Sequence, residues 1–195
     1  MKIDSRRAIF EFLSIVIAVV LAMALTEARQ NYLNRKEAQY SYESILEEIA
    51  ENRGDLISDS TTIGQDVRYL DVYLGKIDSG ESPGEFSLGF TLSFLKSSAL
   101  EVAKINESMA FLPNETNMRV SGVYQTQEFY AEKAKEIFNV MASMNSVNDD
   151  MQSEDFVAKL KEYHFQLRIL RSTIQTYLEE TESFSNELDS LNALK

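Results

Sequence analysis

An uninterrupted apolar run near the N-terminus is the strongest pattern in the sequence. The run from Ala8 to Leu25 is eighteen residues long and contains one charged residue. At about 1.5 Å of rise per residue, a helix of this length covers roughly 27 Å, which is enough to cross the hydrocarbon core of a bilayer. We therefore predict a membrane-spanning helix at residues 8–26. The chain then divides into a short tail with its anchor, residues 1–26, and a soluble domain, residues 27–195.

A cleaved signal peptide is the alternative interpretation of this run. Arg6 and Arg7 would form its basic region, residues 12–21 its apolar region and Ala22-Met23-Ala24 its cleavage pattern. No helix breaker separates the apolar run from the residues that follow it, from Thr26 to Arg53. This continuity favours a retained anchor whose helix runs on into the soluble domain.

Helical periodicity continues beyond the apolar run. Apolar residues recur at steps of three and four along residues 42–53, and a seven-residue repeat runs from Leu56 to Ile77. Gly54-Asp55, between the two stretches, leaves two alternatives: a second helix, or a kinked continuation of the first. Residues 78–85 include two glycines and a proline, so we expect a loop there.

Two more apolar-periodic stretches follow this loop. Residues 87–112 predict a third helix, ended by Pro113. A fourth helix is expected from about Thr116 to Met144, with Gln127 as the one polar residue in its apolar stripe. Residues 145–150 then supply turn and N-cap residue types.

The final helix has the most regular pattern in the chain. Ten apolar residues from Phe156 to Leu191 share one 3.5-residue repeat, which only Thr181 interrupts. The seam is about 35 residues, or roughly 50 Å long, and therefore needs packing partners of similar length. The first two stretches provide that length if Gly54 only kinks them. The expected fold is all-α: a transmembrane helix that continues into an antiparallel bundle of about four long helices, with coiled-coil-like seams.

Charge and composition exclude several classes of function. The net charge is −12, and residues 1–26 carry three basic and two acidic residues, so the soluble domain carries −13. A domain this acidic repels nucleic acid, and we expect no nucleic-acid partner. The chain has no cysteine, which excludes disulfides, thiolate nucleophiles and cysteine-ligated metal sites.

The sequence lacks the usual residues of catalysis and metal binding. The one histidine, His164, has no ligand at metal-binding spacing, and Glu162 points to a different helix face. No phosphate-cradling glycine loop and no nucleophile elbow is present. We therefore expect no catalytic, cofactor-binding or metal-binding residues and no cofactor, with an enzyme that uses carboxylates alone as the third-ranked hypothesis.

Glu11 is the single ionisable residue in the apolar run. A carboxyl group in hydrocarbon is a candidate contact for a partner helix or a proton carrier. Arg7 lies one helical turn away, at the spacing of an ion pair near the membrane interface, which is the favoured interpretation. Basic residues flank the run equally on both sides, so the short amino-terminal tail decides the orientation. We expect the N-terminus in the cytoplasm and the soluble domain outside it.

Four short segments resemble an uncharacterised bacterial family of short single-pass membrane proteins. Thr26-Glu27-Ala28-Arg29 stands where that family has Asn-Glu-Trp-Arg, and Leu100 replaces a tryptophan in Ser98-Ala99-Leu100-Glu101. The other two segments are Leu46-Glu47-Glu48-Ile49 with Asn52-Arg53, and Tyr124-Gln125-Thr126-Gln127. The resemblance implies a helical domain on a bacterial inner-membrane anchor, and it implies no activity.

Two non-enzymatic functions remain. The first is a membrane-anchored scaffold or accessory subunit, which binds the lipid bilayer and either a second copy of the chain or another membrane protein. The second is an extracytoplasmic sensory or ligand-binding bundle that signals through a partner.

Overall fold

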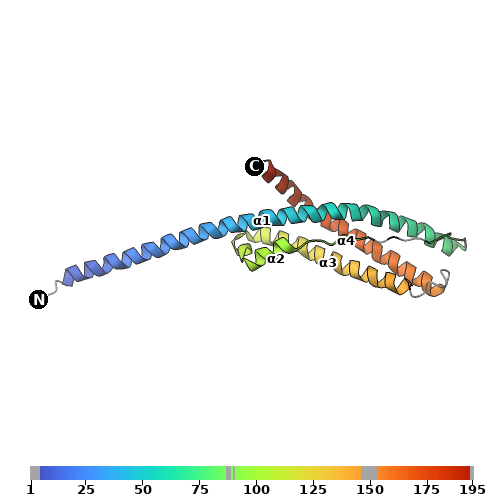
Figure 1. The fold of residues 1–195 in the computed structure, drawn as a ribbon, viewed down its shortest axis with the longest axis horizontal. Coiled ribbons are helices and arrows are strands. Elements are labelled where there is room, and N and C mark those ends of the chain that lie inside the picture. Colours follow the sequence, from blue (N-terminus) through green and yellow to red (C-terminus); the bar gives the residue numbers. More distant parts are fainter. Residues whose placement is uncertain (1–4, 87–88, 90, 146–152, 194–195) are drawn as a thin grey trace.

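The computed structural model is an elongated all-α protein (Figure 1). It describes residues 5–86, 89, 91–145 and 153–193, with side chains from Ile9 onward and without that of Asn145. Its helices are α1 (Ser5–Ser79), α2 (Ser98–Ile105), the 3-10 turn η1 (Ser108–Phe111), α3 (Asn114–Asn145) and α4 (Glu154–Asn192). The expected all-α class is therefore confirmed.

Helix α1 runs without interruption through 75 residues. Gly54 lies inside it, so the two periodic stretches on either side belong to one helix and not to two. At helical rise α1 is roughly 110 Å long. The first buried side chain along it is that of Ala38, so residues 27–37 form an exposed stretch of helix between the apolar run and the bundle.

The bundle consists of three long helices. Helices α1 and α3 run in the same direction, and α4 returns antiparallel to both and packs against each of them (Figure 1). The seven-residue repeat of α1 and the seam of α4 form the centre of the core, as their patterns predict. Fully buried members of these seams include Leu56, Ile63, Leu70, Leu160, Tyr163, Leu167 and Ile174.

The expected helix at residues 87–112 is wrong. Gly89 and residues 91–97 form no helix, α2 is only eight residues long and η1 four. Pro113 does not end a helix but directly precedes α3, where its carbonyl accepts from the backbone N–H of Asn117. In place of the expected long helix, residues 91–97 form an extended stretch, which we call the return segment, and the short helices α2 and η1 follow it.

The last two helices match their patterns closely. Helix α3 begins two residues before the expected start, and α4 spans the whole predicted seam. Residues 146–150 of the expected turn lie outside the described residues, and the observed N-cap of α4 is Ser153, whose Oγ accepts from the N–H of Phe156 at 3.2 Å. Gln127 and Thr181, which interrupt the apolar patterns, are both buried.

Candidate functional site: an apolar arm and a polar clasp on one helix

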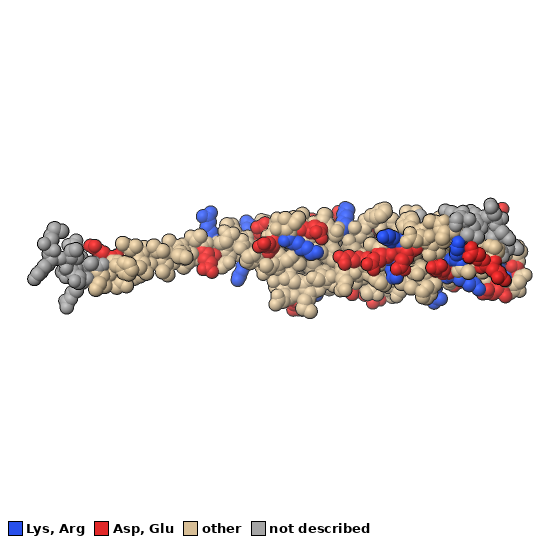
Figure 2. Space-filling model, turned by 90° about the horizontal axis from the view of Figure 1, so that it is seen from below, with Lys and Arg blue, Asp and Glu red and all other residues tan. Residues whose placement is uncertain are grey.

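The N-terminal part of α1 exposes apolar side chains instead of packing them, and we call its residues 9–26 the arm. Its most apolar stretch has a mean hydropathy of 2.5, and none of it is buried within the protein. Phe12, Ile17 and Leu25 are each more than half exposed. Figure 2 shows this arm almost free of charged side chains, whereas acidic and basic groups are frequent on the bundle. Within the described part of the chain, this is the one helix long and apolar enough to cross a membrane.

The polar side chains on the arm bond within the helix. Ser14 donates to the carbonyl of Glu11 at 2.8 Å, and Thr26 donates to the carbonyl of Ala22 at 2.8 Å. These bonds suit a low-dielectric environment, in which a hydroxyl without a partner is costly. The side chain of Arg7 lies outside the described residues, so the expected pair of Arg7 with Glu11 stays a prediction.

Three buried polar residues follow one face of α1 inside the bundle. Glu48, Asn52 and Asp59 are almost fully buried and lie at steps of four and seven residues. Each bonds to the return segment 91–97 or to the start of α2, and each meets one polar residue of α3. We name these three residues of α1 and their partners on α3 the polar clasp, which consists of Glu48, Asn52, Asp59, Tyr124, Gln127 and Tyr130.

Asn52 binds the backbone of the return segment as a neighbouring strand would. Its Nδ2 donates to the carbonyl of Lys96 at 2.8 Å, and its Oδ1 accepts from the N–H of Lys96 at 2.8 Å. Gln127 adds a donor to the same carbonyl at 2.7 Å and accepts from Asn52 at 3.2 Å. An extended chain without a sheet needs such side-chain partners for its backbone groups.

Glu48 caps a helix that has no cap of its own. The N-cap residue of α2, Ser97, makes no side-chain capping bond. Glu48 Oε2 instead accepts from the N–H of Ala99 at 2.9 Å and from Ser98 Oγ at 2.7 Å. A carboxylate at this position also interacts favourably with the helix dipole. Its second oxygen accepts from the hydroxyl of Tyr124 at 2.6 Å, a length typical of charge-assisted bonds.

Asp59 fixes the far end of the return segment. Its carboxylate accepts from the N–H of Ser93 at 2.8 Å, from Ser93 Oγ at 3.1 Å and from the hydroxyl of Tyr130 at 2.9 Å. Burial, followed by the hydrogen bond to Glu48, raises the pKa of Tyr124. Burial, followed by the charge of Asp59, raises the pKa of Tyr130. Both tyrosines therefore stay protonated and remain donors.

A second polar contact joins α1 to α4. The guanidinium of Arg53 donates to the carbonyl of Leu178 and to Thr181 Oγ1, which explains the polar residue in the seam of α4. Nearer the arm, the hydroxyl of Tyr42 donates to Glu187 at 3.0 Å. Burial, and then this hydrogen bond, raises the pKa of Tyr42 to about 12.

His164 lies where α4 faces α1. Its Nε2 lies 3.0 Å from Asp71 Oδ1 across the interface of α1 and α4, and the side chain is mostly buried. Among the residues that the structure describes, no three histidine, cysteine or acidic side chains lie together in a way that could hold a metal ion.

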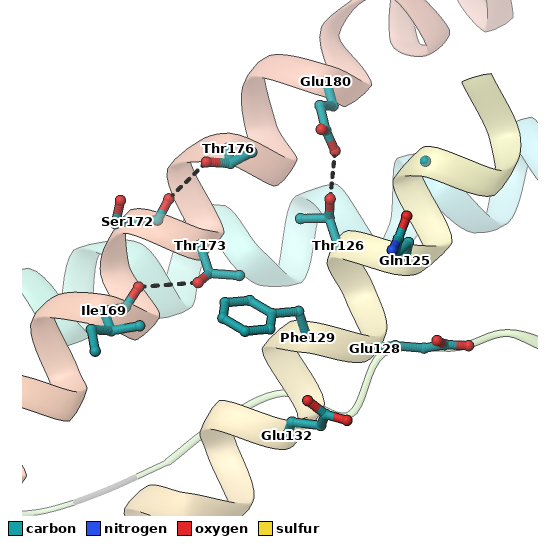
Figure 3. Close-up of a pocket in the computed structure, with 11 residues that line it drawn as sticks. Gln125, Thr126, Glu128, Phe129, Glu132, Ile169, Ser172, Thr173, Thr176 and Glu180 are labelled. Atoms are coloured by element: carbon teal, nitrogen blue, oxygen red, sulfur yellow. Dashed lines mark hydrogen bonds between the residues drawn. The ribbon is translucent and has the colours of Figure 1, made fainter. Parts of the chain in front are cut away.

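An open groove of about 710 Å³ lies between α3 and α4, and Figure 3 shows the residues that line it. Phe129 points from α3 toward α4, and Thr126 donates to Glu180 across the groove at 2.8 Å. Glu128 and Glu132 also border it. The walls of the groove carry both hydroxyl and carboxylate side chains.

No protein-family model, curated protein or solved structure matches this chain. The resemblance to an uncharacterised bacterial family therefore stays a prediction. Three of its four segments meet in space, because Glu48, Asn52, Ser98, Tyr124 and Gln127 all lie in or beside the polar clasp.

Sequence reasoning missed Asp59 altogether. The signal was available, because Asn52 and Asp59 occupy positions of the apolar stripe that continues through Leu56 and Ile63. A polar residue at a seam position predicts a buried hydrogen-bonded partner.

Proposed function

We propose that this protein is a non-enzymatic, membrane-anchored scaffold or accessory subunit of a membrane complex. The observation that supports it most is the continuity of α1, which extends from the exposed apolar arm into the core of the bundle without a break. An anchor joined to its domain by a flexible linker only tethers it. A continuous helix also sets the distance and orientation of the bundle relative to the membrane.

The stretch between arm and bundle supports the same function. From residue 26 to Ala38 the helix rises roughly 18 Å, which keeps the acidic bundle away from lipid headgroups. A second copy of the chain or another membrane protein would meet α1 both within the bilayer and along this exposed stretch. Glu11 is the one ionisable contact that the arm offers between residues 9 and 26.

Copurification tests this function. The intact protein, extracted in mild detergent after crosslinking in membranes, should bring down a stoichiometric partner or a second copy of itself. A variant whose residues 8–26 are replaced by an unrelated apolar segment serves as the control for anchoring alone. Recovery of a clean monomer from both membranes and detergent would refute the proposal.

The proposed location is a bacterial inner membrane, with the N-terminus in the cytoplasm and the bundle in the periplasm. The absence of cysteine makes a direct test available. Ser190→Cys places a single thiol on an exposed position near the end of α4. A maleimide that does not cross the inner membrane should label it in intact cells. Labelling only after lysis would place the bundle in the cytoplasm.

A second candidate function, ligand binding, is favoured by one further observation. The return segment 91–97 borders a mostly apolar cavity of about 520 Å³, within the size range of small-molecule sites. Because the polar clasp bonds this segment directly to α1, a ligand there would act on the helix that enters the membrane. A ligand that raises the melting temperature of the intact protein would support this function.

A further inference from the structure

The cavity beside the return segment has apolar walls. It lies between segment 92–97, α2 and the stretch of α3 from Tyr124 to Phe138. Its apolar wall includes Leu92, Leu95, Leu100, Ala131, Ala134 and Phe138. Tyr124 and Tyr130 also line it, but their hydroxyls are bonded to Glu48 and Asp59 of α1. These two tyrosines therefore contribute ring surface to the wall.

The polar groups at the base of the cavity are already bonded within the protein. Gln127 uses its amide nitrogen on the carbonyl of Lys96 and its amide oxygen on Asn52. A ligand group placed there gains little from hydrogen bonding and gains mainly from removal of apolar surface from water. The interior of the cavity therefore favours a hydrocarbon group over a polar one.

The size of the cavity suits one extended chain. Its lining residues on α3 run from Tyr124 to Phe138, about 21 Å at helical rise, and its volume is about 520 Å³. A cavity of this extent, which we call the slot, has room for a single extended hydrocarbon chain.

The rim is charged with both signs. Glu101 and Lys104 of α2 and Glu128 and Lys135 of α3 border the mouth. Lys104 lies 3.6 Å from Glu101, and both side chains are more than half exposed. A weak, solvated pair of this kind can exchange its partner for the polar head of a ligand at small cost.

The side chain of Phe94 is exposed to solvent at the mouth of this slot. Its ring is 91% exposed, although Ser93 and Lys96 on either side of it are bonded to Asp59 and Asn52. The backbone is therefore fixed in a way that keeps a large apolar ring outward, which is unfavourable unless something covers it. A chain in the slot would supply that cover.

We propose that this slot binds the hydrocarbon chain of a single-chain amphiphile, with its polar head at the charged rim and with Phe94 lying over the chain. The bilayer into which α1 leads is the nearest source of such molecules. A free fatty acid and a lysophospholipid share this chemistry. The assignment rests on the ligand-binding candidate function and not on the scaffold function.

The absence of tryptophan gives a direct test. Phe94→Trp places the only indole of the chain at the mouth of the slot, and Phe165→Trp places one on α4 at a position 61% exposed and outside the cavity. Each variant, as the full chain in phosphatidylcholine vesicles, is titrated with palmitic acid in one arm and with palmitoyl lysophosphatidylcholine in the other. The emission of the Phe94→Trp protein should shift to shorter wavelength and saturate, while that of Phe165→Trp stays constant.

Filling the slot should block the response. Ala131→Phe adds a ring at an exposed alanine that lines the cavity, and Ala158→Phe adds the same ring at an exposed alanine of α4. In the Phe94→Trp background, the first should weaken binding at least tenfold and the second should leave it unchanged. Response to one amphiphile alone identifies the head group, and response to both assigns recognition to the chain.

Three results would overturn the assignment. One is no saturable shift with either amphiphile, and another is an equal shift in both reporters, which indicates partition into the bilayer. The third is emission of the Phe94→Trp protein that shifts to shorter wavelength without amphiphile as protein density in the vesicles rises. That result would indicate that a second copy of the chain covers the mouth of the slot. If some other compound raises the melting temperature but neither amphiphile changes the emission of the Phe94→Trp protein, the ligand-binding function is supported and the acyl-chain ligand is refuted.

Discussion

Replacement of Asn52 by leucine tests whether side chains of α1 hold the return segment in place. Leucine has a similar size and fits the apolar stripe of α1, but it removes both bonds to Lys96 and the bond to Gln127. The side chain of Asn52 is completely buried, so water does not simply replace it. We expect a loss of stability that is largest in segment 91–97.

The magnitude follows from the groups left without partners. Gln127 Oε1 is buried and loses its donor, which costs about 1–3 kcal/mol. The N–H of Lys96 lies nearer the surface and loses a net contribution of about 0.5–1.5 kcal/mol. Together, Asn52→Leu should lower the free energy of unfolding by about 2–4 kcal/mol. A local loss of about 2 kcal/mol speeds amide exchange in the segment about 30-fold.

Hydrogen exchange followed by mass spectrometry measures this on the intact protein in detergent, and urea unfolding gives the global value. Asn34→Leu is the matched control, because Asn34 lies on the same helix before the bundle begins. It should leave both measurements unchanged. If Asn52→Leu alters neither exchange at 91–97 nor the unfolding free energy by more than about 0.5 kcal/mol, the clasp does not hold the segment.

Three other predictions address the rest of the molecule. Thr181→Val keeps the side-chain shape but removes an acceptor of Arg53, so urea unfolding should show a loss of about 1–2 kcal/mol. The fold raises the pKa of Tyr42 from 10.0 to about 12, so the stability that Tyr42 contributes is complete below pH 10 and is lost as the pH rises toward 12. Tyr42→Phe should therefore flatten the plot of melting temperature against pH in this range. Glu11→Gln should leave partner recovery unchanged if Glu11 is interfacial, and a loss would make it the intramembrane contact.

Periodicity predicted the long helices because their seams are the core. In α4 the repeat runs from Phe156 to Leu191, and in α1 from Leu56 to Ile77, and the two seams pack against each other. A pattern of this length has one low-energy solution, a helix with its apolar stripe buried. Gly54 changes nothing here, because the burial on either side of it outweighs its low helix propensity.

The pairings within the polar clasp could not be predicted from the sequence, because its members are far apart in the chain. Asn52 and Gln127 are separated by 75 positions, and Asp59 and Ser93 by 34. Each looks like an isolated lapse in an apolar stripe. Only the packing of three helices around one segment shows that the lapses share hydrogen bonds.

The failure at residues 87–112 has the same cause. A helix there would satisfy its own backbone and would remove the bonds that Asn52 and Asp59 make to backbone groups, at about 1–3 kcal/mol for each buried polar group left without a partner. An extended segment instead exposes backbone N–H and C=O groups that match them, as the bonds to Ser93 and Lys96 show. Local periodicity favours a helix, whereas the polar residues of α1 favour an extended chain. The segment is extended because only an extended chain offers backbone partners to both Asn52 and Asp59.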